Sequence, residues 1–157
     1  MSSATADKRN LRRQMRRLRR EVDDQAGRSA RIWSAVTSLD SVRNASTVMV
    51  FTSIPGEPDT APFVAWCARE GKQVVHPEDA PRAALPDVVI VPGVAFTTDG
   101  HRLGQGGGWY DRFLPGVRDD CTTVGVGFAP QLVDTLPIEP HDARLDIVVT
   151  DEAVFSR

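Results

Sequence analysis

Apolar residues recur with helical spacing near the start of the chain. Leu11, Met15, Leu18 and Val22 follow one another at intervals of four, three and four residues, and most of the positions between them are basic. Such intervals place the apolar side chains on one narrow stripe of a helix. We therefore predict a basic N-terminal helix over about residues 7–22 that docks on the rest of the protein through this stripe.

Beyond this helix, short apolar runs alternate with helical stretches. Strands are predicted at 47–53, 73–76, 87–91, 122–128 and 145–150. Helices are predicted over about 28–39, over 61–70, and from Trp109 onward. The run DVVIV at 87–91 is apolar without alternation, as in a strand that is covered on both faces. This order favours an open, mostly parallel sheet between layers of helices.

The composition is that of a globular protein. With 157 residues, 41% hydrophobic and 25% charged, the chain suits one domain over residues 1–157. No apolar run reaches the ~18 to 20 residues of a membrane span, and residues 1–20 lack a signal-peptide pattern. Cys67 and Cys121 have no CxxC spacing and are interpreted as reduced thiols. We expect a cytoplasmic protein, a monomer or weak homo-oligomer, without a membrane partner.

Charge is distributed unevenly along the chain. Residues 1–20 carry eight of the 19 basic residues and one acid, whereas 21–157 carry 11 basic and 20 acidic residues. A basic arm on an acidic body indicates an anionic partner: nucleic acid, a phosphorylated small molecule, or the body itself. Residues 1–30 contain no aromatic side chain that could stack on a base. Since the apolar stripe also directs the helix toward the body, we do not expect a nucleic-acid partner.

The segment RLGQGGGWYDRFLP, residues 102–115, has four glycines within five positions and precedes a predicted helix. Glycines allow a backbone to approach a ligand closely, and free N–H groups at a helix start favour an anion such as phosphate. Asp111 follows as a candidate metal ligand, and Arg102 and Arg112 flank the loop. The alternative is an ordinary glycine-rich turn.

Two common nucleotide-binding motifs do not fit this segment. No Gly-Lys-Ser/Thr triplet of a P-loop occurs in the chain. A dinucleotide-binding fingerprint follows its strand directly, whereas ten residues separate Val91 from Arg102. The segment is therefore interpreted as an anion-binding loop of another type.

Four segments together resemble one protein family. GHRLGQGGGWYDRFLP (100–115) resembles the signature of the 5-formyltetrahydrofolate cyclo-ligases, also called methenyltetrahydrofolate synthetases. KRNLRRQMRRLRR (8–20) resembles the family's N-terminal helix, FTSIPGEPDT (51–60) its strand and loop, and residues 124–150 its C-terminal region. The resemblance implies a three-layer α/β/α sandwich with a mostly parallel open sheet, Rossmann-like and of the NagB/RpiA/CoA-transferase type.

The resemblance also implies an activity, that of an ATP-dependent C–N ligase. In this family ATP phosphorylates the formyl oxygen of 5-formyltetrahydrofolate, N10 attacks the activated carbon, and 5,10-methenyltetrahydrofolate, ADP and phosphate are released. An amide oxygen is a poor leaving group until it is phosphorylated, so the protein's task is positioning and charge stabilisation. The alternative is a catalytically weak or non-catalytic relative that binds nucleotide or folate in a regulatory role.

Matched positions imply roles for individual residues. Lys8 and Arg102 are implied as catalytic. Contacts with the co-substrate ATP are implied for Lys8, Arg12, Arg102, Gly104, Gln105, Gly106, Gly107, Gly108 and Tyr110. Contacts with the reduced folate are implied for Thr52, Glu57 and Trp109, the last at a position where the family usually has tyrosine or phenylalanine. Mg²⁺ is implied as cofactor, held by Asp111 and Asp146.

The chain departs from the family in its middle. Between GKQVVHP and DVVIVPG the family carries a few dozen more residues that help to wall the folate pocket, and this chain has only EDAPRAALP. The ATP and Mg²⁺ half of the site therefore matches fully, whereas the folate half is reduced. His76, His101 and His141 are far apart in sequence and form no metal-binding motif. We interpret them as structural or surface groups, with His141 and Asp142 shaping the loop before Asp146.

Overall fold

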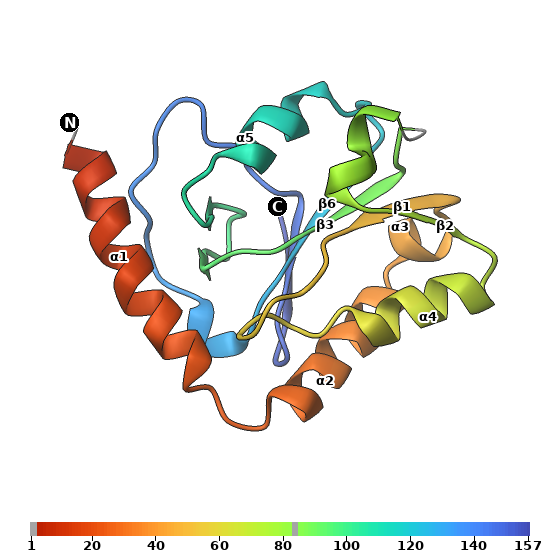
Figure 1. Ribbon diagram of the computed structural model, residues 1–157, viewed down its shortest axis with the longest axis horizontal. Helices are drawn as coiled ribbons and strands as arrows, with labels where there is room; N and C mark the ends of the chain where they lie inside the picture. The colour runs from red at the N-terminus through yellow and green to blue at the C-terminus, as the bar shows by residue number, and fades with distance from the viewer. Residues whose placement is uncertain (1–2, 83–84) are drawn as a thin grey trace.

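A six-stranded mixed sheet lies at the centre of the computed structural model, which describes residues 3–82 and 85–157 (Figure 1). Its strands, in spatial order, are β2 (Gln73–Val75), β1 (Thr47–Val50), β3 (Val88–Val91), β6 (Thr122–Val126), β7 (Ile147–Val149) and β8 (Val154–Ser156). The first five are parallel and β8 is antiparallel to β7. β1 and β3 are buried at every position, as their unbroken apolar runs predict.

Three helices cover one face of this sheet: α2 (Gln25–Thr37), α3 (Asp40–Arg43) and α4 (Ala61–Arg69). Ile32 and Val36 of α2 and Phe63 of α4 are fully buried against the strands. α2 begins three residues before the predicted start because the Asp24 side chain accepts a hydrogen bond from Gly27 N (3.2 Å) and caps it. The predicted helices at 28–39 and 61–70 are thus confirmed.

Short elements cover the opposite face. These are α5 (Trp109–Phe113), the 3₁₀ turn η2 (Leu114–Gly116), and a hairpin of β4 (Ala95–Phe96) and β5 (Arg102–Leu103). Phe96, Leu114 and Leu145 are buried there against β1, β3 and β7. The three-layer α/β fold is therefore confirmed. The hairpin and β8 were not predicted from the sequence.

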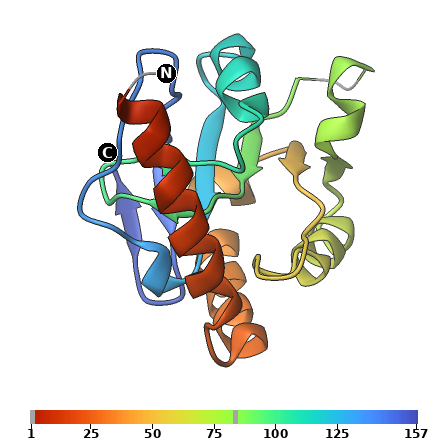
Figure 2. The same cartoon turned by 60° about the vertical axis from the view of Figure 1, so that its left-hand side comes forward.

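Helix α1 (Ser3–Arg20) lies against the hairpin and beside the 3₁₀ turn η3 (Ala129–Gln131), outside the sheet (Figures 1 and 2). Met15 is buried and packs with Leu103 and Leu136. The predicted docking through the apolar stripe is thus confirmed. The helix ends at Arg20, before Val22, which packs against the α2 cluster instead.

The predicted strands are confirmed with narrower bounds, because several flanking residues turn into loops. Residues 51–53 after β1 and 127–128 after β6 leave the ladder. The proline-rich connection at 76–86 contains the 3₁₀ turn η1 (Pro77–Arg82); residues 83 and 84 of it lie outside the described part of the chain. Among the helices that the structure describes, none has the length and apolarity needed to cross a membrane.

Candidate active site

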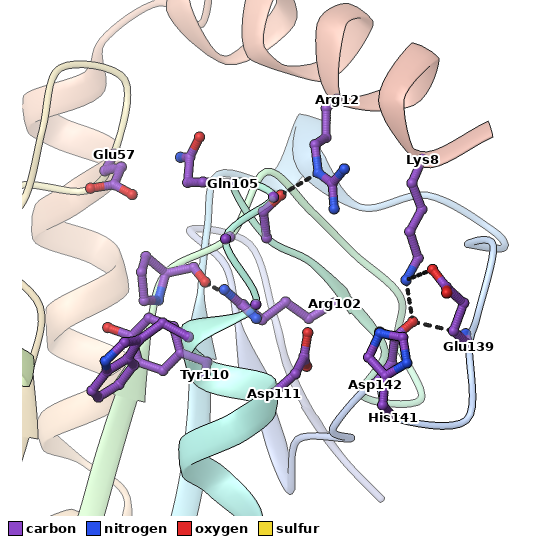
Figure 3. A pocket seen from close by; sticks show the side chains of 17 residues that line it. Lys8, Arg12, Glu57, Arg102, Gln105, Tyr110, Asp111, Glu139, His141 and Asp142 are labelled. Carbon is purple, nitrogen blue, oxygen red and sulfur yellow. Dashed lines mark hydrogen bonds and ion pairs between the residues drawn. The ribbon is translucent and has the colours of Figure 1, made fainter. Parts of the chain in front are cut away.

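A cavity of about 470 Å³ opens beyond the carboxyl ends of β1 and β3, beneath α1 (Figure 3). It is lined by Lys8, Arg12, Glu57, Pro92, Gly93, Arg102, residues 104–111, Glu139, His141 and Asp142. The carboxyl edge of a parallel sheet is where loops converge and ligands bind in α/β proteins. Segments that are far apart in sequence meet there, which makes this cavity the candidate active site.

Lys8 lies at one end of the cavity between two acids. Its Nζ is 2.9 Å from Glu139 Oε1 and 2.5 Å from Asp142 Oδ2, and only 8% of its side chain is exposed. Burial acts to lower the pKa of Lys8, but the hydrogen bonds and charges of the two acids outweigh it and raise this pKa. Burial likewise opposes ionisation of Asp142, and Lys8 and Glu139 N together hold the pKa of Asp142 below its usual value. We call these three residues the lysine end.

The glycine loop is held against α1 by two arginines. Arg12 Nε donates to Gly104 O (2.9 Å), while Arg16 donates through Nη2 to Gln105 O (2.6 Å) and through Nε to Gln105 Oε1 (3.1 Å). Gly106 has φ +114°, a conformation that glycine adopts without strain. Because Lys8, Arg12 and Arg16 are spaced by four, one face of α1 presents all three toward the cavity side. The spacing of Lys8 and Arg12 on one face is thus confirmed.

Arg102 lies in the middle of the cavity (Figure 3). Its Nε donates to Pro92 O (2.6 Å), and its guanidinium lies over the Tyr110 ring at 4.9 Å from the centroid. Burial lowers the pKa of Arg102, and the charge of Asp111 opposes this shift. A Cβ on Gly104 would lie 2.6 Å from Arg102 Nη2, so the glycine at this position makes room for the guanidinium.

Glu57 lies at the other end of the cavity, on the loop after β1 (Figure 3). Its side chain is 5% exposed, and its Oε1 accepts a hydrogen bond from Ile54 N (3.0 Å). Burial raises the pKa of Glu57, opposed by that hydrogen bond and by two arginine charges. Tyr110 and Trp109 stand nearby with ring centroids 4.8 Å apart. We call Glu57, Trp109 and Tyr110 the glutamate end.

Asp111 lines the cavity, but Asp146 does not. Asp111 Oδ1 accepts a hydrogen bond from Ala143 N (2.9 Å). Asp146 precedes β7, at the amino edge of the sheet, where its Oδ2 accepts from Thr123 N (2.9 Å) and Thr123 Oγ1 (3.1 Å). The structure therefore does not bring the predicted metal pair together. The C-terminal carboxylates that share the cavity with Asp111 are those of Glu139 and Asp142.

Thr52 also lies outside the cavity lining, because β1 ends at Val50 and the Thr52 side chain is exposed. The other predicted site residues all line the cavity. Sequence reasoning missed Glu139 and the site role of Asp142, for which it had no spacing signal. It also missed Arg16, which the interval of four from Arg12 could have identified.

His141 lies at the cavity rim, His76 contacts the backbone, and both cysteines are buried. His141 stands at the cavity rim, with 67% of its side chain exposed and Nε2 3.5 Å from Asp142 Oδ1. His76 Nδ1 contacts Val50 O (2.8 Å). Cys67 and Cys121 are buried free thiols, and burial raises the pKa of each to about 11. In residues 3–82 and 85–157, no group of three or more His, Cys, Asp and Glu side chains is arranged to hold a metal ion.

Comparison with known proteins gives consistent matches. Residues 4–84 and 78–151 match the model of the 5-formyltetrahydrofolate cyclo-ligase family. The 5-formyltetrahydrofolate cyclo-ligase of Escherichia coli K12 is 34% identical over 181 positions, which cover 92% of this chain and 98% of that protein. That of Mycolicibacterium smegmatis is 39% identical over 64 residues, 41% of this chain and 33% of the relative.

Two solved structures share the fold. The 5,10-methenyltetrahydrofolate synthetase of Aquifex aeolicus superimposes with a TM-score of 0.80 at 26% identity, over 95% of this chain and 92% of that one. The 5,10-methenyltetrahydrofolate synthetase of Mycoplasma pneumoniae has a TM-score of 0.78 at 22% identity, over 92% and 99% of the two chains. The likeness to the first extends over nearly the whole of both chains.

The comparisons also locate the shortened connection. The alignment with the E. coli protein spans 181 positions, more than the 157 residues of this chain, so residues of that relative have no counterpart here. The two matched segments of the family model meet at residues 78–84. This is the connection for which the sequence predicts a deletion.

Proposed function

The chain belongs to the 5-formyltetrahydrofolate cyclo-ligase family, and from this membership and the geometry of the cavity we propose that it converts 5-formyltetrahydrofolate to 5,10-methenyltetrahydrofolate at the expense of ATP. The observation that carries the proposal is a single cavity with Lys8, Arg12 and the glycine loop at one end, a buried carboxylate at the other end, and Arg102 between them. Such a cavity suits one polyanionic substrate and one substrate with hydrogen-bond donors.

The triphosphate of ATP binds beside the lysine end and the glycine loop. Lys8 and Arg12 reach the cavity from α1, and Lys8 stays charged because its pKa is raised. The glycine loop has no side chains at 106–108, so phosphate oxygens can approach its backbone N–H groups. Positive charge and backbone donors in one place are the usual means of holding phosphates.

Asp111 and Asp142 fit a magnesium ion that accompanies ATP. Both line the cavity near the triphosphate position, and the pKa of Asp142 is held low enough to keep its carboxylate ionised. Mg²⁺ prefers oxygen ligands and usually binds through one or two carboxylates, substrate phosphates and water. Asp111 and Asp142 would hold the ion, which would supply positive charge to offset the charge that develops on the phosphates.

The reduced folate binds at the glutamate end. Glu57 Oε1 is already occupied by Ile54 N, so Oε2 is the oxygen that accepts hydrogen bonds from neighbouring N–H groups of a flat heterocycle. Trp109 and Tyr110 offer rings against which such a heterocycle packs. Arg102, between the ends, stabilises the charge that develops as the phosphoryl group moves to the formyl oxygen and later leaves with it.

The shortened connection supports a second candidate, a relative that binds nucleotide or folate with little or no catalysis. The resemblance to the family implies that the residues it lacks belong to the folate half, while every residue of the lysine end is present. In that case Mg-ATP binds at the lysine end and no methenyl product forms.

One assay separates the two candidates. The purified protein is incubated with 5-formyltetrahydrofolate and Mg-ATP, and the absorbance of methenyltetrahydrofolate is followed together with ADP release. We expect product only when both substrates and Mg²⁺ are present. ATP binding by calorimetry without product would favour the non-catalytic relative, and absence of both binding and product would contradict both candidates.

A further inference from the structure

Arg19 is a buried cation beside the active site that has no assigned role. Its side chain is 4% exposed, although it lies on a helix that carries eight basic residues, and it does not line the cavity. Its Nη1 donates to Gly93 O (3.2 Å) and lies 3.9 Å from Glu57 Oε2. Burying a guanidinium costs free energy unless hydrogen bonds or an ion pair compensate for the lost hydration.

The surroundings of Arg19 leave space for its side chain but do not provide an acceptor for every one of its hydrogen-bond donors. Gly56, with φ +92°, lies directly over the side chain, and a Cβ there would be 3.3 Å from both Cγ and Nε of Arg19. The Nε atom is buried and has no hydrogen-bond partner among the described residues. Gly93 O also accepts a hydrogen bond from Gln131 Nε2 (3.0 Å). Arg19 thus joins α1 to the Glu57 loop and to the segment after β3, at some cost in unmet hydrogen bonding.

The two oxygens of Glu57 are held by different partners. Oε1 is held by Ile54 N, while Oε2 faces the Arg19 guanidinium at a distance longer than a hydrogen bond. At 3.9 Å Arg19 attracts the carboxylate without occupying the oxygen. Oε2 therefore remains available to a ligand. Arg19 also opposes the burial that raises the pKa of Glu57.

We propose that Arg19 is a positioning residue for the reduced folate: it keeps the Glu57 carboxylate ionised and aimed into the cavity, without touching the substrate. The inference rests on the proposed function, because it deepens the role of Glu57 at the glutamate end. It differs from a purely structural role, in which Arg19 only fastens α1 to the body. A purely structural role predicts a loss of stability when Arg19 is replaced, without a selective rise in the KM for the folate.

The direct test is a ¹³C-carboxyl NMR titration of Glu57 in the wild-type protein and in Arg19→Met. Methionine matches the length of the arginine stem but carries no charge. We expect the pKa of Glu57 to rise in Arg19→Met and to stay near the wild-type value in Arg19→Lys, which keeps the charge. Arg13→Met, an exposed arginine on the same helix, is the matched control and should leave the titration unchanged.

The functional test is the KM for each substrate. Arg19→Met is expected to raise the KM for 5-formyltetrahydrofolate about tenfold and to leave the KM for ATP unchanged, as for the loss of a charged interaction. The acid limb of the pH profile of kcat/KM for the folate should move to higher pH. In a Glu57→Gln background, Arg19→Met should add no further rise, because Arg19 acts through Glu57.

The outcomes of these tests separate the role of Arg19 from the proposed function. An unchanged Glu57 titration, or equal increases in KM for both substrates, would overturn the role of Arg19 while leaving the proposed function intact. A wild-type protein that forms no product overturns the proposed function, and the titration still decides whether Arg19 controls Glu57. Thermal denaturation of every variant comes first; if Arg19→Met does not fold, Arg19→Gln, which retains hydrogen-bond donors, takes its place.

Discussion

The Asp142 and Glu57 carboxylates stand at opposite ends of one cavity (Figure 3), and their pKa values are shifted in opposite directions although burial acts to raise both. Asp142 has Lys8 Nζ at 2.5 Å, and its pKa is lowered. Glu57 has its nearest arginine nitrogen at 3.9 Å, and its pKa is raised. Lys8 and Glu139 N both donate hydrogen bonds to Asp142 and together outweigh the cost of desolvating it, whereas Arg19 is too far from Glu57 to donate one.

This contrast assigns different tasks to the two ends. A charge that is compensated within the protein persists over a wide pH range and can serve a permanently charged partner such as Mg-ATP. The Glu57 carboxylate has too few hydrogen-bond donors within the protein to offset its burial. A substrate that brings N–H donors therefore stabilises this carboxylate when it binds. The lysine end is accordingly a stable ionic cluster, and the glutamate end is completed by its substrate.

Replacement of Asp142 is expected to have the largest effect. Asp142→Ala removes a ligand candidate for Mg²⁺ and leaves Lys8 buried with a single acid, so we expect turnover to fall about 100-fold and the free energy of unfolding to fall by about 3 kcal/mol. Steady-state kinetics and urea denaturation measure the two losses. Asp146→Asn is the matched comparison: it weakens the bonds to Thr123 and lowers stability, but Mg-ATP affinity should not change. If Asp146→Asn weakened Mg-ATP binding and Asp142→Ala did not, the metal site would lie at the amino edge of the sheet.

Arg102→Lys should affect both ends at once. A lysine cannot both donate to Pro92 O and lie flat over Tyr110, so the central charge loses its orientation. We expect the KM values for ATP and for the folate to rise together, each about tenfold, with a lower kcat. An effect on one substrate alone would mean that Arg102 belongs to that end and does not link the two.

Glu57→Gln should affect the glutamate end alone. The KM for 5-formyltetrahydrofolate is expected to rise about tenfold while ATP affinity is unchanged. Because burial raises the pKa of Glu57 above its value in the unfolded chain, the folded protein gains stability as the pH falls through that pKa. The neutral glutamine should therefore leave the thermal midpoint unchanged or raise it.

The pH dependence provides a second test of the same variant. In the wild type, folate affinity should fall as the pH drops through the pKa of Glu57, since only the carboxylate accepts two hydrogen bonds. In Glu57→Gln this acid limb should be absent. A limb that persists in the variant would assign the titration to another group.

These predictions depend on features that the sequence revealed to different degrees. The interval of four between Lys8 and Arg12 predicts a shared helix face, and the apolar stripe through Met15 predicts which face is inward; both are local properties of a helix. The buried strands follow from their unbroken apolar runs. Local pattern was sufficient wherever the neighbours in space are also neighbours in sequence.

Asp142 and Asp146 show where local pattern is insufficient. The two acids lie four residues apart in one family-like block, and nothing in their spacing says which faces the cavity. The answer depends on where β7 begins: Asp146 stands at its amino end, while Asp142 is still in the loop that returns to Lys8. Arg19 is similar, since eight basic residues lie on α1 and only the docked helix shows that Arg19, like Lys8, is buried.

Replacements in the glycine loop should have the smallest effects. Gly106 has φ +114°, so Gly106→Ala strains the backbone and should lower the free energy of unfolding by about 1 kcal/mol. A Cβ on Gly107 would meet nothing within 4 Å, so Gly107→Ala should leave stability unchanged. Urea denaturation of this matched pair measures the strain by itself.

Mg-ATP affinity of the same pair then tests how closely the triphosphate approaches the loop. If phosphate oxygens contact the backbone there, a methyl group at either position holds them away, and calorimetry should show Kd for Mg-ATP raised severalfold in both variants. The affinity for 5-formyltetrahydrofolate should not change, because the glutamate end contains neither residue. Unchanged Mg-ATP affinity in Gly107→Ala would mean that the triphosphate is held by Lys8 and Arg12 alone, and the division between the two ends would then depend on side-chain charge rather than on the glycine backbone.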